Sequence, residues 1–279
     1  MKKISRRSFM AAAAVSVAAL ALTACGGSAS TASSAAASSV AASSEAASTS
    51  AAAELTTVEA GKLTMATNAA FPPYEMTTDA GEFEGIDIDT AKAIAEKLGL
   101  ELQIDDMDFD AALLSVQQGK ADIVMAGVTV TDERKAVMDF SDSYATGIQS
   151  IIVPEGSDIT SPDDLAGKKI GTQRGTTGYI YCSDDFGDEN VVAYDDGLTA
   201  VQALNNGQVD AVVIDNAPAQ EFVAANPGLK VLDTSYAEED YAIGMAKGSA
   251  LEDAVNKALE ELKADGTLQA IVDKYINAN

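Results

Sequence analysis

Arg134 is the residue best placed in this sequence to bind an anion. The residues before Gly127 are apolar β-formers that predict a buried strand, and those after it predict a polar loop. Thr131 is a suitable N-cap, so we expect a helix that begins directly after it and carries Arg134 in its first turn. A guanidinium can form two parallel hydrogen bonds with a carboxylate, and Gly127 would let such a ligand approach the backbone closely. The alternative is that Arg134 only pairs with Glu133 or Asp139 at the surface.

A second segment repeats this pattern and ends at an acidic residue. Residues 112–127 align with residues 200–215 at a constant offset of 88, and each copy predicts a helix, a glycine stop and a buried strand. The alignment places Asp215 where the first copy has Gly127, at the carboxyl end of a strand, where open α/β sheets bind ligands. Unless the match arose by chance, Arg134 and Asp215 are expected to face each other across a cleft between two similar lobes. The other matched pairs are Gly119 with Gly207 and Asp122 with Asp210.

The composition argues against several classes of function. The 279 residues are 47% hydrophobic and 22% charged, which is typical of a soluble globular protein. The formal net charge of −25 would repel a phosphate backbone, so we expect no nucleic-acid partner. There is no histidine, and the two cysteines are Cys25 and Cys182, which disfavours a histidine general base, a His–Cys zinc site and a disulfide scaffold. We therefore expect neither a metal nor a cofactor.

The first 24 residues are typical of a lipoprotein signal peptide. Four basic residues precede an apolar run over residues 9–22, which is too short and too rich in alanine for a comfortable membrane span. Residues 22–25, Leu-Thr-Ala-Cys, resemble a bacterial lipobox, in which the chain is cut before the cysteine and the cysteine is lipidated. We expect residues 1–24 to be removed and Cys25 to anchor the protein to the outer face of the bacterial cell membrane. An ordinary secretory signal or a membrane anchor is the alternative, and residues 5–10 also resemble a twin-arginine export signal.

Residues 25–57 predict a flexible tether. From residue 28 to residue 53 the sequence consists of Ala, Ser and Thr apart from Val40 and Glu45. Such a segment lacks the apolar surface that a folded core needs, and the many Ser and Thr residues weaken the alternative of an alanine-rich helix. The segment would connect the anchor to a folded domain.

Predicted strands and helices alternate along the rest of the chain. This alternation indicates α/β sheets with mostly parallel strands. A further helix start is expected at residues 161–164, where a serine cap is followed by proline and two acids. The expected strands are 63–67, 100–104, 123–125, 148–153, 169–172 and 241–245, and the expected helices include 87–98, 111–118, 251–263 and 268–275.

Six stretches match one pattern in order and spacing. They are residues 68–75, 85–89, 127–135, 139–141, 175–177 and 263–268. Together they resemble the polar amino-acid group of the bacterial extracellular solute-binding proteins, family 3, over roughly residues 60–279. The resemblance implies a two-lobed, type II periplasmic-binding-protein-like fold, in which each lobe is a mostly parallel sheet flanked by helices. It also implies a receptor that closes on one free amino acid and delivers it to the permease subunits of an ABC importer.

The resemblance implies a division of the folded chain as well. Lobe 1 would comprise residues 58–149 together with residues 245–279, and lobe 2 would comprise residues 150–244. The chain would cross between the lobes near residues 149–150 and 242–243, and these two crossings would form the hinge. We expect the protein to act as a monomer.

The resemblance assigns the two ends of an amino-acid ligand to residues of both repeats. Arg134 corresponds to the clamp of the α-carboxylate, and Thr129 and Thr177 supply hydroxyl and backbone donors beside it. Asp215 corresponds to the acid that holds the α-ammonium, with help from the carbonyl of Gly127. A zwitterion needs such a facing cation and anion, so the chemistry of the residues agrees with the resemblance.

The ligand side chain is assigned to four further residues. Phe71 and Phe109 correspond to aromatics that sandwich it, although packing in the core is the alternative for both. Asn68 and Gln173 occupy positions that tune the choice of side chain, and Thr176 lies in the same expected loop. Many relatives carry an acid where Asn68 stands, which favours a polar, uncharged ligand here over one that is strictly cationic. Acids nearby could restore a negative potential, namely Glu75, Asp108 and Asp110.

Two other functions compete with the receptor. Some relatives of this fold are dehydratases, and a carboxylate such as Glu75 could serve an enzyme on the same scaffold. No nucleophile–base pair is visible in the sequence, so we expect no enzymatic activity. A structural or adhesive lipoprotein would not need the Arg134 and Asp215 clamp.

Overall fold

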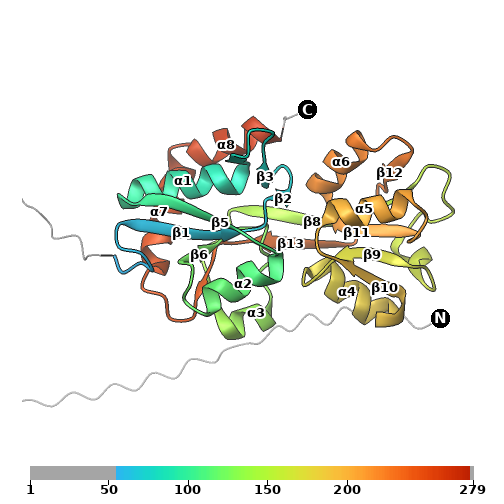
Figure 1. Ribbon diagram of the computed structural model, residues 1–279, viewed down its shortest axis with the longest axis horizontal. Helices are drawn as coiled ribbons and strands as arrows, with labels where there is room; N and C mark the ends of the chain where they lie inside the picture. Colours follow the sequence, from blue (N-terminus) through green and yellow to red (C-terminus); the bar gives the residue numbers. More distant parts are fainter. Residues whose placement is uncertain (1–54, 277–279) are drawn as a thin grey trace, which may run out of the picture. The chain divides into compact units, whose positions relative to one another are not determined.

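The computed structural model describes residues 55–276, which belong to one compact unit of the chain. Figure 1 shows two groups of helices and strands, with strands β8 (Ala145–Pro154) and β13 (Ala237–Tyr241) running between them. Each group is built around its own sheet, as the predicted two-lobed fold requires. The first sheet has the order β5-β1-β6-β14-β7, with β1 (Lys62–Thr67), β5 (Glu101–Asp106), β6 (Ile123–Val124), β7 (Met138–Phe140) and β14 (Gly244–Ala246).

The second sheet has the order β10-β9-β11-β8-β12, and β13 pairs with the first half of β8. The expectation of mostly parallel sheets was wrong, because both sheets are mixed. Parallel pairs join β1 to β5 and β6, and β9 to β10 and β11. Antiparallel pairs join β14 to β6 and β7, and β8 to β11, β12 and β13, since β14 and β8 belong to the segments where the chain crosses between the sheets. The remaining strands are β9 (Ile170–Gln173), β10 (Val191–Tyr194), β11 (Ala211–Asp215) and β12 (Leu229–Val231), and a small separate sheet consists of β2 (Ala70–Phe71), β3 (Glu75–Thr77) and β4 (Phe83–Glu84).

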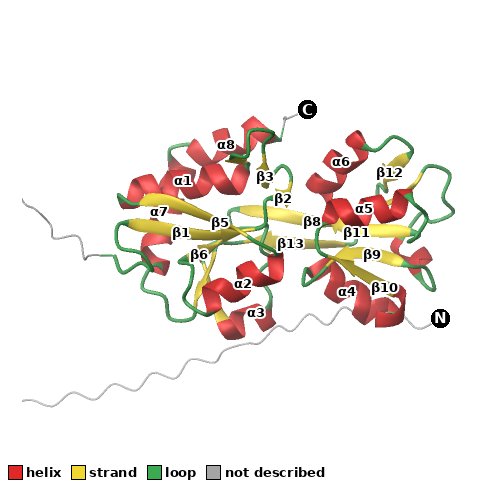
Figure 2. Cartoon of the chain, viewed as in Figure 1, coloured by secondary structure: helices red, strands yellow, loops and turns green. Residues whose placement is uncertain are grey.

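Helices cover both faces of each sheet (Figure 2). Successive residues of a strand point to opposite faces, so Met65 packs into one cluster with α1, α7 and α8, whereas Ala66 packs into another with α2. In the second lobe α5 and α6 lie on one face and α4 on the other. The helices are α1 (Ile86–Leu98), α2 (Phe109–Gln117), α3 (Asp132–Val137), α4 (Thr177–Phe186), α5 (Gly197–Asn205), α6 (Asn216–Ala225), α7 (Glu252–Ala264) and α8 (Thr267–Tyr275).

The structure confirms the internal repeat. Gly119 and Gly207 end α2 and α5 in the same left-handed conformation, with φ of 65° and 68°. The aspartate three residues later then accepts a hydrogen bond from the backbone at the edge of a parallel strand. Asp122 accepts from Thr64 N at 2.8 Å, and Asp210 accepts from Lys169 N at 2.8 Å. Each lobe therefore uses an aspartate at the equivalent position of the repeat to fix the start of a strand.

Two predicted elements differ from the structure. The prediction of one strand over residues 241–245 was wrong, because β13 ends at Tyr241 in the second sheet and β14 begins at Gly244 in the first. The chain changes sheets within an unbroken apolar run, which period and propensity do not reveal. The expected helix at residues 161–164 is a 3-10 turn (Pro162–Leu165), although its capping box at Ser161 is present. The lobe boundaries and the hinge positions stay predictions.

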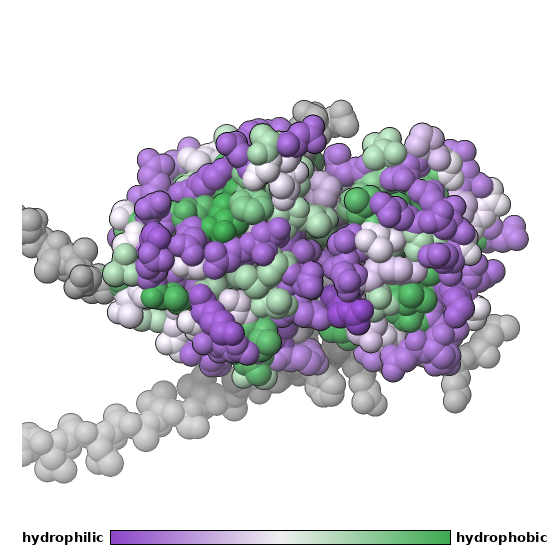
Figure 3. Space-filling view, viewed as in Figure 1, coloured by the Kyte–Doolittle hydropathy of each residue, from purple (hydrophilic) through white to green (hydrophobic). Residues whose placement is uncertain are grey.

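The signal peptide, most of the tether and Cys25 lie outside the described residues. Within residues 55–276, no helix combines the length and the hydrophobicity that a membrane crossing requires. Hydrophilic residues cover most of the visible face of this part, in line with the high net negative charge (Figure 3).

Candidate functional site

A small cavity lies where the loops of the two sheets meet. All ten residues predicted to bind substrate line it, together with Glu75 and Ala126. The structure thus brings together side chains that are up to 147 positions apart in the sequence, although their role as ligand contacts stays a prediction. The ten are Asn68, Phe71, Phe109, Gly127, Thr129, Arg134, Gln173, Thr176, Thr177 and Asp215.

Arg134 is held in the cavity by backbone carbonyls of both lobes. Thr131 caps α3 as predicted, because its hydroxyl accepts a hydrogen bond from Arg134 N at 3.1 Å. The guanidinium then donates from Nη1 to Thr129 O at 2.7 Å and from Nη2 to Gly175 O at 3.2 Å. Its Cζ lies 5.4 Å from the centre of the Phe109 ring, within range of a cation–π contact. Arg134 is only 9% exposed, so these contacts fix its position and orientation.

The charge of Arg134 is not paired with a carboxylate at contact distance within the described residues. The alternative of a surface ion pair was wrong, since Asp139 pairs instead with Lys247 at 2.6 Å. Burial lowers the pKa of Arg134 from its ordinary value, while the negative charges of Glu239 and Asp215 oppose that shift. A buried cation without a direct counter-ion is suited to receive an anionic group.

Asp215 ends β11 and faces the same cavity. It is 8% exposed, and it accepts hydrogen bonds from the hydroxyl of Tyr241 and from Gln149 Nε2, the latter at 2.8 Å. Burial raises the pKa of Asp215 to about 7, and the nearby charge of Glu239 adds to the shift, although the two hydrogen bonds oppose it. A cation placed beside this carboxylate would favour its ionised form.

Glu239 is a functional candidate that the sequence reasoning missed. Its Oε2 accepts three hydrogen bonds, from Thr177 Oγ1 at 3.0 Å, Gln149 Nε2 at 2.9 Å and Thr129 Oγ1 at 3.2 Å. Glu239 is 7% exposed on β13, and Tyr241 points to the same side of that strand. That period of two was the available signal, because an acid sharing a strand face with a buried aromatic is unusual.

Asn68 and Gln173 bond to each other across the cavity. Gln173 Nε2 donates to Asn68 Oδ1 at 2.8 Å, which joins the loop after β1 to the end of β9. Asn68 Nδ2 donates to Met107 O at 3.0 Å, and Gln173 Nε2 also lies 3.3 Å from Asp195 O. These contacts orient both amides and leave the carbonyl oxygen of Gln173 as an acceptor.

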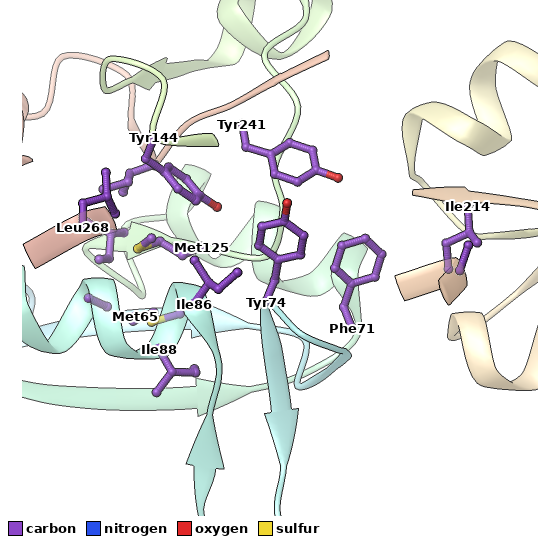
Figure 4. Packing of buried hydrophobic residues seen from close by; sticks show 14 of the residues in the cluster. Met65, Phe71, Tyr74, Ile86, Ile88, Met125, Tyr144, Ile214, Tyr241 and Leu268 are labelled. Atoms are coloured by element: carbon purple, nitrogen blue, oxygen red, sulfur yellow. The ribbon is translucent and has the colours of Figure 1, made fainter. Parts of the chain in front are cut away.

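Phe71, Tyr74 and Tyr241 form a row of buried aromatic rings (Figure 4), and Phe71 at its end lines the cavity. Phe71 stacks on Tyr74 with ring centres 5.9 Å apart, and Tyr74 meets Tyr241 edge-on at 5.3 Å. Gly127 has a φ of 54°, and a Cβ there would lie 2.9 Å from the Phe71 ring, so the loop can approach this ring only with glycine. Phe71 and Phe109 are each 6% exposed and belong to packed clusters, so both residues pack in the core and also line the cavity.

Glu75 and Asp87 form a second pair of buried acids beside these rings. Asp87 Oδ2 accepts from Gly127 N at 3.0 Å and from the hydroxyl of Tyr144 at 2.8 Å. No donor of the described residues reaches Asp87 Oδ1 or either oxygen of Glu75. Burial raises the pKa of Glu75 well above its ordinary value, and the charge of Asp87 adds to this. Burial also raises the pKa of Asp87 to about 6. Glu75 therefore keeps its proton and shares it with Asp87.

The three acids expected to supply negative potential differ in position. Protonated Glu75 lines the cavity but brings no charge to it. Asp108 and Asp110 line a neighbouring cavity beside Arg174 and not the cavity that holds Arg134. Among residues 55–276, no cluster of His, Cys, Asp or Glu is arranged to hold a metal ion.

Comparisons with known proteins agree with the geometry of this site. Residues 63–278 match the model of the bacterial extracellular solute-binding proteins, family 3. The L-cystine-binding protein TcyJ of Escherichia coli (strain K12) is 33% identical over 226 residues, which is 79% of this chain and 85% of that protein. The arginine-, lysine-, histidine-binding protein ArtJ of Geobacillus stearothermophilus superposes with a TM-score of 0.75 at 34% identity, over 78% of this chain and 96% of that one.

A solved ancestral arginine-binding protein, bound to glutamine, superposes with a TM-score of 0.74 at 44% identity, over 77% of this chain and 98% of that one. These neighbours confirm the predicted type II periplasmic-binding-protein fold. Because the family model covers nearly all of the described residues, the chain belongs to the bacterial extracellular solute-binding proteins, family 3.

Proposed function

We propose that this protein is an extracytoplasmic receptor that binds one free amino acid between its lobes and delivers it to the permease of an ABC importer. The observation that carries the proposal is the buried guanidinium of Arg134, which lacks a contacting carboxylate in the described residues and shares its cavity with Asp215. The relatives named above bind amino acids, and none is an enzyme, so the dehydratase alternative has no support.

The proposed lobes are residues 58–149 with 245–279, and residues 150–244. The return of β14, α7 and α8 to the first sheet supports this division. Closure would then bring Arg134 of the first lobe and Asp215 of the second onto opposite ends of one ligand. The α-carboxylate would bind Arg134 and the backbone N–H groups at the start of α4, near Thr176 and Thr177, where the helix dipole favours an anion. The α-ammonium would bind Asp215, aided by the carbonyl of Gly127.

The side chain of the ligand would lie between Phe71 and Phe109 and reach Asn68 and Gln173. Both amides are neutral, and Glu75 behind them holds its proton, so this end of the cavity carries no full charge. The carbonyl oxygen of Gln173 offers an acceptor to a donor on the ligand. We therefore infer that a polar, uncharged amino acid such as L-glutamine is preferred over L-arginine.

A thermal-shift screen against free amino acids and small carboxylates tests the proposal. A ligand present at 100 times its Kd should raise the free energy of unfolding by about 2.7 kcal/mol. For the best amino acid, the analogue without the α-ammonium and the analogue without the α-carboxylate should both fail to stabilise the protein. Turnover of the ligand, or stabilisation by an analogue that lacks either charge, would contradict the receptor assignment.

Arg134→Lys provides the matching test of the clamp. Lysine keeps the charge but loses the fork that reaches both backbone carbonyls, so binding should weaken by about 30-fold or more. Arg174→Lys is the control, because Arg174 is exposed and, within residues 55–276, forms an ion pair only with Asp195, at 3.6 Å. Equal affinity of the two variants would remove Arg134 from the clamp.

We also propose that the receptor is a monomer tied to the outer face of the cell membrane. Removal of residues 1–24 would expose Cys25 for lipidation, and residues 25–57 would serve as the tether. A protein held by two or more acyl chains stays on the membrane, whereas one held by a single chain does not. Cys25→Ala should therefore move the protein to the soluble fraction, while Cys182→Ala, a change at the buried cysteine, should not. Equal membrane recovery of Cys25→Ala and the unsubstituted protein would contradict the anchor.

A further inference from the structure

One carboxylate oxygen connects the two lobes of this protein at the edge of the cavity. Oε2 of Glu239 lies 3.2 Å from Thr129 Oγ1, 3.0 Å from Thr177 Oγ1 and 2.9 Å from Gln149 Nε2. Thr129 follows β6 of the first sheet, Thr177 opens α4 on the second, and Gln149 lies on β8, which runs between the two. Glu239 is therefore the acceptor for one donor from each lobe and for one donor from the connecting strands.

This arrangement lowers the stability of the folded protein, so we expect Glu239 to have a role that offsets the loss. Glu239 is 7% exposed, and its second oxygen, Oε1, receives no donor from the described residues. A buried carboxyl oxygen without a partner destabilises a folded protein. Asp215 lies close enough that its charge and that of Glu239 act on each other, and Gln149 Nε2 donates to both. An apolar residue at position 239 would avoid these costs, so the position has a reason other than packing.

We propose that Glu239 is a positioning residue that latches the two lobes together in their closed arrangement and orients the threonines of the binding site. Thr129 is tied to the strand of Glu239, because Val130 N donates to Asp240 O at 3.0 Å and Ala242 N donates to Val128 O at 3.1 Å. Thr177 opens α4 of the second lobe, so separation of the lobes would part the two threonines and break at least one of their bonds to the carboxylate. The two threonine oxygens lie 3.4 Å apart and share this one acceptor.

The latch also fixes which donors face the ligand. Each threonine hydroxyl has one proton, and in this arrangement both protons go to Glu239. The ligand carboxylate is then left to Arg134 and to the backbone N–H groups beside the threonines. Glu239 thus acts through Thr129 and Thr177 and does not itself line the cavity.

The first test needs no ligand and does not depend on the proposed function. Nitroxide labels at Gln118→Cys and Asn206→Cys report the distance between the lobes, because these exposed positions end α2 and α5. The labels are introduced in a Cys25→Ala background, in which the remaining cysteine, Cys182, is buried. Glu239→Ala should shift the ratio of closed to open protein toward the open form by about 10- to 100-fold, the factor that one or two charge-assisted hydrogen bonds supply.

Glu238→Ala is the matched control, because Glu238 precedes Glu239 on the same strand and is exposed. It should leave the distance distribution unchanged. If Glu239→Ala fails to fold, Glu239→Gln and Thr177→Val replace it, and each should open the ligand-free protein to a smaller extent. The same distance distribution in the Glu239 variants, Glu238→Ala and the unsubstituted protein would overturn the latch.

A second test uses L-glutamine and L-arginine as probes, and it does rest on the proposed function. A latch that forms after the first encounter should leave the association rate unchanged, so Glu239→Gln should raise the dissociation rate by about tenfold. A merely structural defect would lower the fraction of active protein without changing that rate. In a double-mutant cycle, Glu239→Gln and Thr177→Val should be non-additive, whereas additive effects would show that the two residues act separately. If neither probe binds, the proposed ligand class fails while the distance measurement still decides the latch.

Discussion

Two pairs of buried acids flank the cavity, and they differ in the hydrogen-bond donors that reach them. In the proton-sharing pair, Glu75 and Asp87 of the first lobe, three of four oxygens receive no donor from the described residues, so one proton stays between the carboxyl groups. In the donor-rich pair, Asp215 and Glu239 on the second-lobe side, hydroxyl and amide groups donate to three of four oxygens. The first pair therefore holds one proton, which leaves Glu75 neutral beside the cavity and Asp87 bonded to Gly127 N and the hydroxyl of Tyr144, whereas the second pair places Asp215 at the cavity itself, where a cation can reach it. Burial alone does not decide which acid can bind a ligand, because the carboxylate must also face the cavity, as Asp215 does and Asp87 does not.

The largest difference between the pairs is expected in ligand binding. Asp215→Asn keeps the shape and removes the charge that pairs with the α-ammonium, so affinity should fall by about 30-fold to several thousand-fold. Glu75→Gln also keeps the shape, and because Glu75 is already neutral, affinity should stay within about threefold. Calorimetry on both variants measures the contrast. Comparable losses in the two would mean that Glu75 is ionised and that the pairs do not differ as described.

The proton-sharing pair should matter more for stability than for binding. Asp87→Ala leaves the N–H of Gly127 and the hydroxyl of Tyr144 without their acceptor, so the free energy of unfolding should fall by about 2–4 kcal/mol. Glu75→Gln should cost about 1 kcal/mol or less, because the amide can donate to Asp87 where the carboxylic acid did. Urea unfolding of the ligand-free proteins gives both values. A larger loss in Glu75→Gln than in Asp87→Ala would reverse the assignment of the shared proton.

Three of these acids, Glu75, Asp87 and Asp215, should make the protein less stable in the absence of ligand as the pH rises. The folded-state pKa is raised for Glu75, for Asp87 to about 6 and for Asp215 to about 7. Between about pH 4 and pH 7 the folded chain holds protons that the unfolded chain has released, so this stabilisation is present below pH 4 and is lost as the pH rises to 7. Urea unfolding from pH 4.5 to pH 7.5 should show the decline, and Asp215→Asn should flatten it. A stability that rises over this interval would contradict the raised values.

The smallest expected effect is a proton released on binding. Because burial raises the pKa of Asp215 to about 7, most of the empty protein is protonated there at pH 6, and the α-ammonium must displace that proton. Affinity should therefore fall by up to about tenfold per pH unit below pH 7 and level off above it. Calorimetry in buffers of different ionisation enthalpy should count about one proton released at pH 6 and few at pH 8. No release at pH 6 in the unsubstituted protein would place the pKa of Asp215 lower than stated.

The sequence revealed those site residues whose role depends on local position. Arg134 was found because a strand, a loop and a threonine cap precede it, and Asp215 because the repeat aligns it with a strand end. Glu239 and Asp87 depend on contacts between distant segments. Glu239 meets Thr129 across 110 positions, and Asp87 meets Gly127 across 40. The alternation along β13 marks Glu239 and the stretch 85–89 contains Asp87, but neither signal identifies the partner, which only the folded chain shows.

The fold was predictable because most of its elements also depend on local signals, with one exception. The helices of both repeats end at glycines, and the strands are apolar runs of ordinary length, which are local signals. The strand expected over residues 241–245 failed because the chain leaves one sheet and enters the other between Tyr241 and Gly244. The sequence stays hydrophobic across that crossing, because the residues on both sides of it are buried in their respective sheets.

The position of β14 has a consequence for the order in which the lobes are built. This strand lies between β6 and β7 in the first sheet, yet it follows all strands of the second sheet in the chain. During synthesis and export from the N-terminus, the first sheet stays incomplete until residue 246 has emerged, whereas residues 145–241 already contain every strand of the second sheet. The second lobe should therefore mature first and the earlier-synthesised lobe last. Pulse-labelled hydrogen exchange during refolding would show protection in β9 and β11 ahead of β1 and β6 if the same order holds for the complete chain.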